Sequence, residues 1–378
     1  MIKKLLTKET AWILAISVIP VFLVYLPFLL GIKQFIFLDL RESGMLQIVR
    51  NWDGPHYLVV AKSLYDQEII KKLLFVSLDT KYYAAHFPLF PLFMLLFIPI
   101  FGWFYSGLVV NLIFGFLANL LFYNIAKKYT KYALFLTFVF TVFPPRFWVV
   151  RSIISPETLM VFTILLSLWL WDNKKYFSSS VAGALAILTK IQAGFLFPAF
   201  AAATVEQYVR EKKLPSLRTL WMVLIPLAFV GLSVIFYFRF GDFMSFFHAE
   251  KHNNLFIAFP FSQFNYRNAW TGTGWLEDVV FYIVAFFVLI VTLYKRKERV
   301  WFYFALFYTI FLIFLPQRDI TRFSFQLAPI FLITFEQFFT SKAFRYALFF
   351  SLPALYFYTL NFIMTNQAAI ADWNHFLK

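Results

Sequence analysis

The chain has 378 residues, of which 61% are hydrophobic, 23% aromatic and only 14% charged. A soluble domain is about half apolar and about a quarter charged, so this composition excludes an ordinary soluble protein and indicates side chains that face lipid. The formal charge of +15 does not indicate a nucleic-acid partner, because more than half of the bases stand in short clusters between apolar runs. Cysteine is absent, which excludes disulfides and thiol chemistry.

The basic clusters determine the expected topology. Six of them carry 18 of the 34 bases and only 5 of the 19 acids: 1–10, 127–131, 172–176, 205–218, 295–299 and 340–346. Loops rich in Lys and Arg face the cytoplasm, so we expect the N-terminus inside. The first span, about 10–31, then runs outward, and 32–86 forms a long first extracytoplasmic loop.

The remaining apolar runs predict further membrane spans. The stretch 86–101 is short for a span and carries three prolines, so we expect an interfacial or re-entrant helix there and the second span at 104–126. Further spans are expected near 132–147, 156–171, 178–190, 192–206, 219–238, 279–294, 299–315, 324–339 and 345–364. The sequence thus predicts an all-α polytopic membrane protein of about eleven transmembrane helices, with interfacial helices in its first loop. We expect a single domain over 1–378 with its C-terminus outside the cytoplasm.

The segment RNWDGPHYLVVAKSLYD (50–66), in the first loop, is the strongest candidate for chemistry. Asp53 precedes Gly54-Pro55, which places it at a turn or a helix start. From Pro55 onward we expect a helix with one apolar face, formed by Tyr57, Val60, Ala61 and Leu64. Asp53 is then either the N-cap of this helix or a general base that takes the proton of a sugar hydroxyl.

Several segments resemble, in the same order, those of one enzyme family. The 50–66 segment resembles the WDG-H-Y signature of the bacterial mannosyltransferases similar to the GPI mannosyltransferase PIG-V, which are type C (GT-C) glycosyltransferases. Similar segments follow in that family's order at 86–93 (HFPLFPLF), 155–171, 182–200, 241–250 (GDFMSFFHAE) and 321–331 (TRFSFQLAPIF). The chain departs from the pattern at Pro55, Glu250 and Phe323, where Gly, Gln and Tyr are usual.

The resemblance implies a GT-C-like helix bundle with an extracytoplasmic active site. It implies inverting transfer of a sugar, usually mannose, from a polyprenyl- or dolichyl-phosphate donor to a glycan, glycolipid or protein acceptor. Asp53 would be the base, and His56 would orient it or contact the donor phosphate. The leaving phosphate would be bound by Lys190 and Arg322, and the acceptor would be contacted by Glu157, Arg146 and Trp52. No cofactor and no metal are expected.

These residues also have structural interpretations that the sequence leaves open. His56 could equally make a structural hydrogen bond. Lys190 and Arg322 could extend toward the membrane interface, and Glu157 could stabilise a helix N-terminus. Arg318 and Asp319 could simply pair with each other.

Other functions are less consistent with the sequence. His248 and His252 are four residues apart, but this spacing alone does not indicate a metal site. The alternative function is a transporter or flippase for a lipid-linked or polar substrate, which would place ionisable residues at mid-membrane and repeat its spans. Only Glu336 lies clearly within a predicted span, and no repeat is visible. A membrane scaffold would have little reason to gather polar residues along one boundary.

Overall fold

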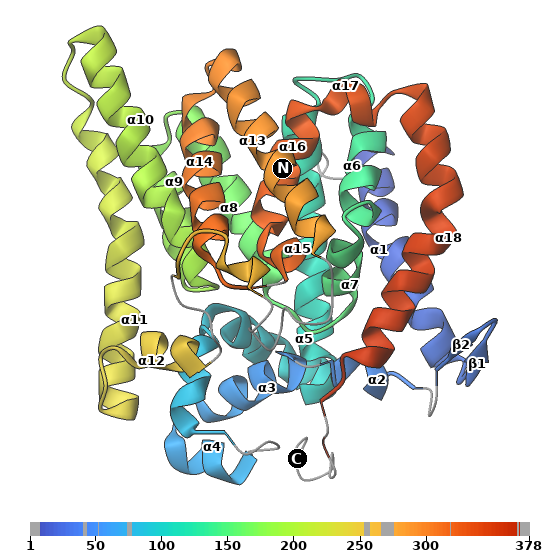
Figure 1. The fold of residues 1–378 in the computed structure, drawn as a ribbon. Helices are drawn as coiled ribbons and strands as arrows, with labels where there is room; N and C mark the ends of the chain where they lie inside the picture. Colours follow the sequence, from blue (N-terminus) through green and yellow to red (C-terminus); the bar gives the residue numbers. More distant parts are fainter. Residues whose placement is uncertain are drawn as a thin grey trace. The chain divides into compact units, whose positions relative to one another are not determined.

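The computed structural model describes residues 8–40, 44–51, 53–73, 78–252, 258–265, 276–317, 319–368 and 370. Within these ranges the only strands are β1 (Gln34–Phe35) and β2 (Leu38–Asp39), which pair in an antiparallel hairpin. The other regular elements are helices (Figure 1), which confirms the predicted all-α class. Trp52, Arg318 and the side chain of His252 lie outside the described residues.

Five helices in the described part of the chain are long and apolar enough to cross a membrane. They are α1 (Lys8–Leu29), α5 (Leu89–Ala126), η4 (Leu217–Val223) continued by α11 (Leu224–Phe240), α13 (Glu277–Arg296) and α18 (Lys342–Thr365). A sixth span is formed if α6 (Ala133–Val142) and α7 (Pro145–Ser152), bent by 76°, cross together. These helices and the composition identify an integral membrane protein.

The predicted number of spans, about eleven, is not confirmed. Each predicted span falls on helical residues, but several of these helices are short. They include α8 (Glu157–Asp172), α9 (Tyr176–Ile187), α10 (Leu196–Glu211) and α14 (Arg299–Phe314). The 16 residues of α8 or α14 measure about 24 Å at ~1.5 Å per residue, less than a hydrocarbon core of ~30 Å. The predicted span 324–339 is divided among η6 (Phe325–Leu327), α16 (Ala328–Thr334) and α17 (Glu336–Phe339), after α15 (Ile320–Phe323).

The long helix α5 contains the break that its sequence predicts. Its 38 residues are interrupted at Gly102, whose φ of 69° and ψ of 174° are not helical. Glycine tolerates a positive φ that other residues avoid. The break separates the short proline-bearing stretch from the run predicted as the second span.

Helices also form in the first loop, as predicted: α2 (Leu46–Val49), α3 (Asp53–Ser63), α4 (Gln67–Leu73) and η2 (Thr80–Ala85). Helix α3 begins at Asp53 rather than Pro55, and it is buried on all sides rather than on one face, from Gly54 through Ala61. The predicted position of Leu64 on the apolar face is wrong, because this residue lies after the helix end with φ 45° and is 42% exposed.

The chain forms two compact units. Unit 1 comprises Met1–Thr80, His86–Phe162 and Phe335–Lys378. In it α1 packs against α5 and α6, α3 packs against α5, and α18 packs against α7. The prediction of a single domain stays a prediction.

Unit 2 comprises Lys81–Ala85 and Thr163–Thr334. Here α9 packs against α11, and α14 packs against both α10 and α13. Trp171 of α8 stacks on Phe200 of α10 with ring centroids 3.9 Å apart. Three shorter helices complete the unit: η3 (Ile191–Phe195), α12 (Ser245–His252) and η5 (Ser262–Phe264).

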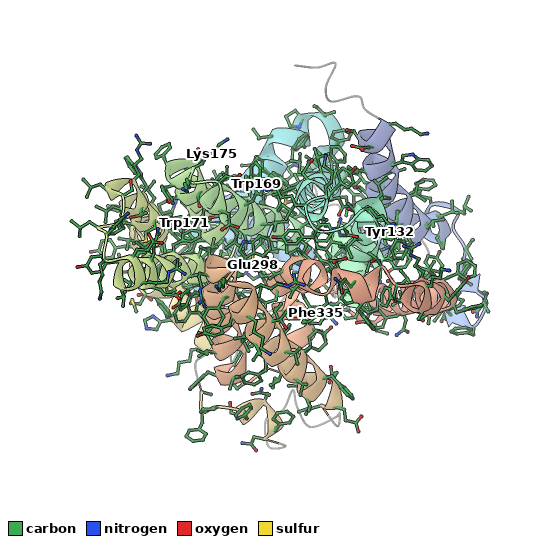
Figure 2. The ribbon with its side chains drawn as sticks, turned by 90° about the horizontal axis from the view of Figure 1, so that it is seen from above. Tyr132, Trp169, Trp171, Lys175, Glu298 and Phe335 are labelled. Atoms are coloured by element: carbon green, nitrogen blue, oxygen red, sulfur yellow. The ribbon has the colours of Figure 1, made fainter. Side chains whose placement is uncertain are left out.

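Within each unit, the predicted cytoplasmic clusters gather at one end. In unit 2, Trp301 donates a hydrogen bond to Asp172 (2.5 Å) and Arg299 pairs with Glu206 (3.1 Å). These two contacts connect the clusters 172–176, 205–218 and 295–299. Figure 2 looks onto this end, with Trp171, Lys175 and Glu298 labelled.

Unit 1 shows the same convergence. The guanidinium of Arg345 lies 4.1 Å from the centroid of the Tyr132 ring, which connects the clusters 127–131 and 340–346. Tyr123, in the last turn of α5, hydrogen-bonds Glu9 of the N-terminal cluster. All six clusters are therefore grouped, three in each unit.

Candidate active site

The proposed base, Asp53, lies at the N-terminus of α3 in unit 1. The turn that precedes the helix is closed by a hydrogen bond from the Gly54 amide to the Asn51 carbonyl (2.8 Å). A helix N-terminus carries a partial positive charge that stabilises a carboxylate. This position is compatible with both the capping and the catalytic interpretation of Asp53.

His56 lies one turn into α3 and is completely buried. Burial lowers the pKa of this imidazole to about 4, although the nearby Asp53 carboxylate opposes the shift. His56 is consequently neutral at physiological pH, where it has one N–H donor and one acceptor nitrogen. In this state it can contact a base or a phosphate by a hydrogen bond but not as a cation.

A second buried histidine accompanies His56. The rings of His56 and His86 are 5.0 Å apart, and Tyr57 meets His86 edge-on at 5.1 Å. The Tyr65 hydroxyl donates to the His86 carbonyl (2.7 Å). Helix α3 and the end of the first loop are thus packed together.

The turn between α7 and α8 contacts the Asp53 segment directly. A Cβ atom at Gly54 would lie 3.2 Å from Cβ of Ile154, so this buried side chain rests on the glycine. The same side chain leaves no room at Gly107 of α5, where a Cβ would lie 2.7 Å from it. Three residues after Ile154 comes Glu157, whose carboxylate accepts a hydrogen bond from Ser155. Two acid-bearing segments far apart in the sequence are therefore neighbours.

Asn111 of α5 holds this turn in place, and sequence reasoning missed it. Its amide nitrogen donates to the carbonyls of Val150 (2.5 Å) and Ile153 (2.6 Å), and its oxygen accepts from Thr158. One buried amide thus joins the end of α7 to the start of α8. A lone Asn within an apolar run is the only signal that could have indicated this role.

The segment after α18 packs against the residues that precede Asp53. The Ala368 amide donates to the Arg50 carbonyl (2.8 Å), and Asn51 forms a backbone bridge with Gln367. The Asn366 side chain donates to that of Asn51 at 3.2 Å. The segment around Asp53 therefore packs against two others, the residues after α18 and the turn that carries Ile154.

The two arginines of α7 have different surroundings. Arg146 is half-buried, and its guanidinium stacks on the Phe362 ring at 3.7 Å. Arg151 lies in the interior of unit 1, where it donates to Asn119 Oδ1 (2.9 Å) and the Gly115 carbonyl (3.3 Å). Arg146 keeps its predicted acceptor role as a hypothesis, whereas Arg151 connects helices.

The predicted phosphate-binding residues belong to unit 2. Lys190 has an extended backbone between α9 and η3, and Arg322 lies in the short helix α15. Both side chains are half-buried. Their assignment to the donor phosphate stays a prediction.

Unit 2 contains a largely apolar cavity of about 730 Å³, and Ile191, the residue after Lys190, is part of its lining. Its apolar wall includes Phe195, Phe246 and Phe311, and its polar lining is formed by Gln192, His248, Glu250 and Lys251. His248 Nδ1 lies 2.8 Å from Asp242 Oδ2. The hydrogen bond with His248 lowers the pKa of the Asp242 carboxyl. A cavity of this kind fits a hydrocarbon chain with a polar end.

Metal binding finds no support in the described part of the chain, where no three His, Asp or Glu side chains are grouped closely enough to hold an ion. The predicted absence of a metal nevertheless stays a prediction. The side chain of His252, four residues from His248, lies outside the described ones.

Comparison with known proteins found a similar solved structure. No protein-family model matches the sequence, and no curated protein matches it. The crystal structure of an Archaeoglobus fulgidus oligosaccharyltransferase in complex with zinc and sulfate is similar with a TM-score of 0.44 and 13% identity. The match covers 95% of this chain and 54% of that protein, so this chain spans about half its length.

Proposed function

We propose that the chain is an inverting GT-C-like glycosyltransferase that moves a sugar from a polyprenyl- or dolichyl-phosphate donor to a hydroxyl acceptor. The family resemblance proposes mannose as the sugar. The observation that carries the proposal is the contact of Ile154 with Gly54. It makes neighbours of the Asp53 segment and the Glu157 segment, two of the segments that resemble the enzyme family. The acceptor class is a glycan, glycolipid or protein.

The proposed reaction needs a single base. The acceptor hydroxyl attacks the anomeric carbon, the bond from that carbon to the phosphate oxygen breaks, and the hydroxyl proton passes to Asp53. Attack opposite the leaving group inverts the anomeric centre. Glu157, Arg146 and Trp52 are proposed to contact the acceptor, and His56 is proposed to orient Asp53 or contact the donor phosphate.

The donor would leave as a lipid phosphate, an anion that fixed cations stabilise. The resemblance assigns Lys190 and Arg322 to this phosphate. The apolar cavity of unit 2 supports a donor with a hydrocarbon chain, because its wall offers Phe side chains and few polar groups. The proposed site is extracytoplasmic, with the N-terminus in the cytoplasm.

The test compares the wild type with Asp53→Asn in nanodiscs supplied with radiolabelled polyprenyl-phosphate-mannose and a lipid extract as acceptor. General-base catalysis contributes about 10²- to 10⁴-fold, so we expect the variant to lose transfer by at least about a hundredfold. Asp39→Asn is the matched control, because Asp39 is an exposed acid of the same loop.

The outcomes separate the enzyme from the base. Transfer by the wild type and by Asp39→Asn, without transfer by a folded Asp53→Asn protein, supports both. Equal transfer by all three proteins removes Asp53 as the base. No transfer by any of them, with several sugar donors, would favour the transporter or flippase.

A further inference from the structure

A small polar pocket lies at the basic end of unit 2. Its volume is about 140 Å³, and its polar lining is formed by Thr204, Glu206, Gln207, Arg210, Thr219 and Arg299. These residues come from α10, η4 and the first turn of α14. Two of the basic clusters, 205–218 and 295–299, therefore contribute directly to one pocket.

Arg299 presents a hydrogen-bond donor that the described residues do not use. Its Nε lies 3.1 Å from Glu206 Oε1, and its guanidinium stacks 4.6 Å above the Tyr294 ring. Its Nη1 is buried and has no hydrogen-bond partner among the described residues. A buried donor left without a partner is energetically unfavourable, because it has lost its hydrogen bond to water. An acceptor atom from a ligand would remove this cost.

The charge of the pocket indicates an anionic ligand. Arg210 pairs with Glu211 (3.2 Å) and Arg299 with Glu206 (3.1 Å). The clusters 205–218 and 295–299, which contribute to the pocket, nevertheless carry eight bases and three acids, so the surroundings of the pocket have an excess positive charge. The planar guanidinium matches the oxygens of a phosphate better than an ammonium does. The pocket is also small, which fits a single phosphate group.

An apolar groove borders the same short helix. Thr219 of η4 lines the polar pocket, whereas its neighbours Leu217, Leu220 and Trp221 line a groove of about 480 Å³ along η4 and the start of α11. These three side chains are 82%, 57% and 46% exposed. Tryptophan is enriched where a membrane protein meets the headgroup region. The polar pocket and the apolar groove therefore meet at η4.

We propose that this pocket binds the phosphate headgroup of an anionic phospholipid, with an acyl chain of the same lipid along the η4 groove. Arg299 Nη1 and Arg210 donate to the phosphate oxygens, and Leu220 and Trp221 contact the chain. Basic residues outside the pocket, such as Arg296 and Lys297, add a general attraction for anionic lipid. The site is independent of the proposed glycosyl transfer.

The experiment measures lipid retained by the purified full chain. The protein is placed in phosphatidylcholine nanodiscs containing a small fraction of phosphatidylglycerol, and native mass spectrometry counts the lipids that stay bound. The informative variant is the double substitution Glu206→Gln with Arg299→Gln, which removes the ion pair without changing the net charge. The control is Arg296→Gln, which removes one charge from an exposed position of the same cluster.

We expect the double variant to retain phosphatidylglycerol about tenfold less than the wild type. The control should lose clearly less, because Arg296 adds only a general attraction outside the pocket. Arg299→Lys keeps the charge without the planar group, so it should give an intermediate loss and provides a second test if the double variant unfolds. Retention that falls with Arg296→Gln but not with the double variant would mean that net charge alone attracts the lipid, which overturns the proposal.

A separate arm distinguishes lipid from soluble phosphate. The unfolding temperature of delipidated protein in detergent is measured with inorganic phosphate and with phosphatidylglycerol. We expect stabilisation by the lipid and none by millimolar phosphate. Equal stabilisation by both, lost in the double variant, would identify a soluble-anion site and overturn the lipid assignment.

Discussion

His56 is the residue whose environment differs most from what its local sequence suggests. It stands beside an acid in the first turn of a helix, a position where a histidine commonly faces water. Instead it is completely buried, and its pKa falls to about 4 because desolvation outweighs the attraction of Asp53. A neutral imidazole beside the proposed base can hold that carboxylate through a hydrogen bond without neutralising it.

This burial predicts a specific dependence of stability on pH. The pKa of an unfolded histidine is about 6.5, above the folded value of about 4, so between these values the unfolded state binds more protons. The contribution of His56 to stability is complete above pH 6.5 and is lost as the pH falls toward 4. One pKa unit corresponds to about 1.4 kcal/mol, so we expect a loss of roughly 3 kcal/mol, measured by chemical unfolding in detergent at pH 7 and pH 4.5.

Two variants isolate this contribution. His56→Gln should show a much smaller loss between the two pH values, whatever its stability at pH 7. His248→Gln should keep the full loss, because His248 is 65% exposed. The same pH dependence in His56→Gln and in the wild type would show that other groups cause it.

At the scale of elements, the turn between α7 and α8 is held largely by one side chain, that of Asn111. Asn111 makes three side-chain hydrogen bonds to this turn and the residues beside it, and Ile154 of the turn contacts Gly54. Eight residues farther along α5, Asn119 also makes three: it donates to Ser17 and Thr141 and accepts from Arg151. The two amides thus form a matched pair, but only Asn111 contacts the turn.

We predict that Asn111→Ala and Asn119→Ala both destabilise the protein, by roughly 3 kcal/mol each, because each leaves buried polar partners without a hydrogen bond. Only Asn111→Ala should also lower kcat for sugar transfer, by about tenfold or more, since Glu157 and Asp53 lose their fixed spacing. Thermal unfolding and transfer rates of both variants provide the measurement.

A parallel loss of activity and stability in both variants would contradict this prediction. If the two variants lose activity in parallel with stability, the turn contributes only to folding. If the wild type shows no transfer, hydrogen exchange still tests the contact. Exchange of 53–58 should then rise in Asn111→Ala and stay unchanged in Asn119→Ala.

The sequence predicts helices better than it predicts their surroundings. Apolar runs of adequate length located α1, α5, α13 and α18. The shortness and the three prolines of 86–101 separated this stretch from the second span, and α5 is interrupted between them at Gly102. The burial of α3 on all sides could not be predicted, because residues distant in the sequence, such as Ile154, provide its cover. Asn111 was equally hidden, since an amide in an apolar run gives no indication of its partner.

At the scale of the whole molecule, the grouping of the basic clusters supports the topology predicted from the sequence. Contacts connect 1–10, 127–131 and 340–346 in unit 1. They also connect 172–176, 205–218 and 295–299 in unit 2. Segments on opposite sides of a bilayer could not be in contact, so these contacts are consistent with the prediction that each set of three lies on one side. The predicted extracytoplasmic segments of unit 1 meet likewise, through Gly54 with Ile154 and Arg50 with Ala368.

The orientation of these groups can be measured because the chain has no cysteine, so each introduced cysteine is the only one. Lys33→Cys lies in the first loop, and Lys128→Cys and Lys174→Cys lie in basic clusters of units 1 and 2. All three positions are exposed. In intact cells, a membrane-impermeant maleimide should label Lys33→Cys and leave the other two unlabelled until the membrane is permeabilised.

The opposite pattern would place the Asp53 segment in the cytoplasm. The topology predicted from the positive-inside bias and the proposed extracytoplasmic transfer would then both be wrong. Labelling of only one of the two basic clusters would show that the units do not share one orientation. The expected pattern requires that the loop carrying Asp53 and both basic ends face opposite sides of the same membrane.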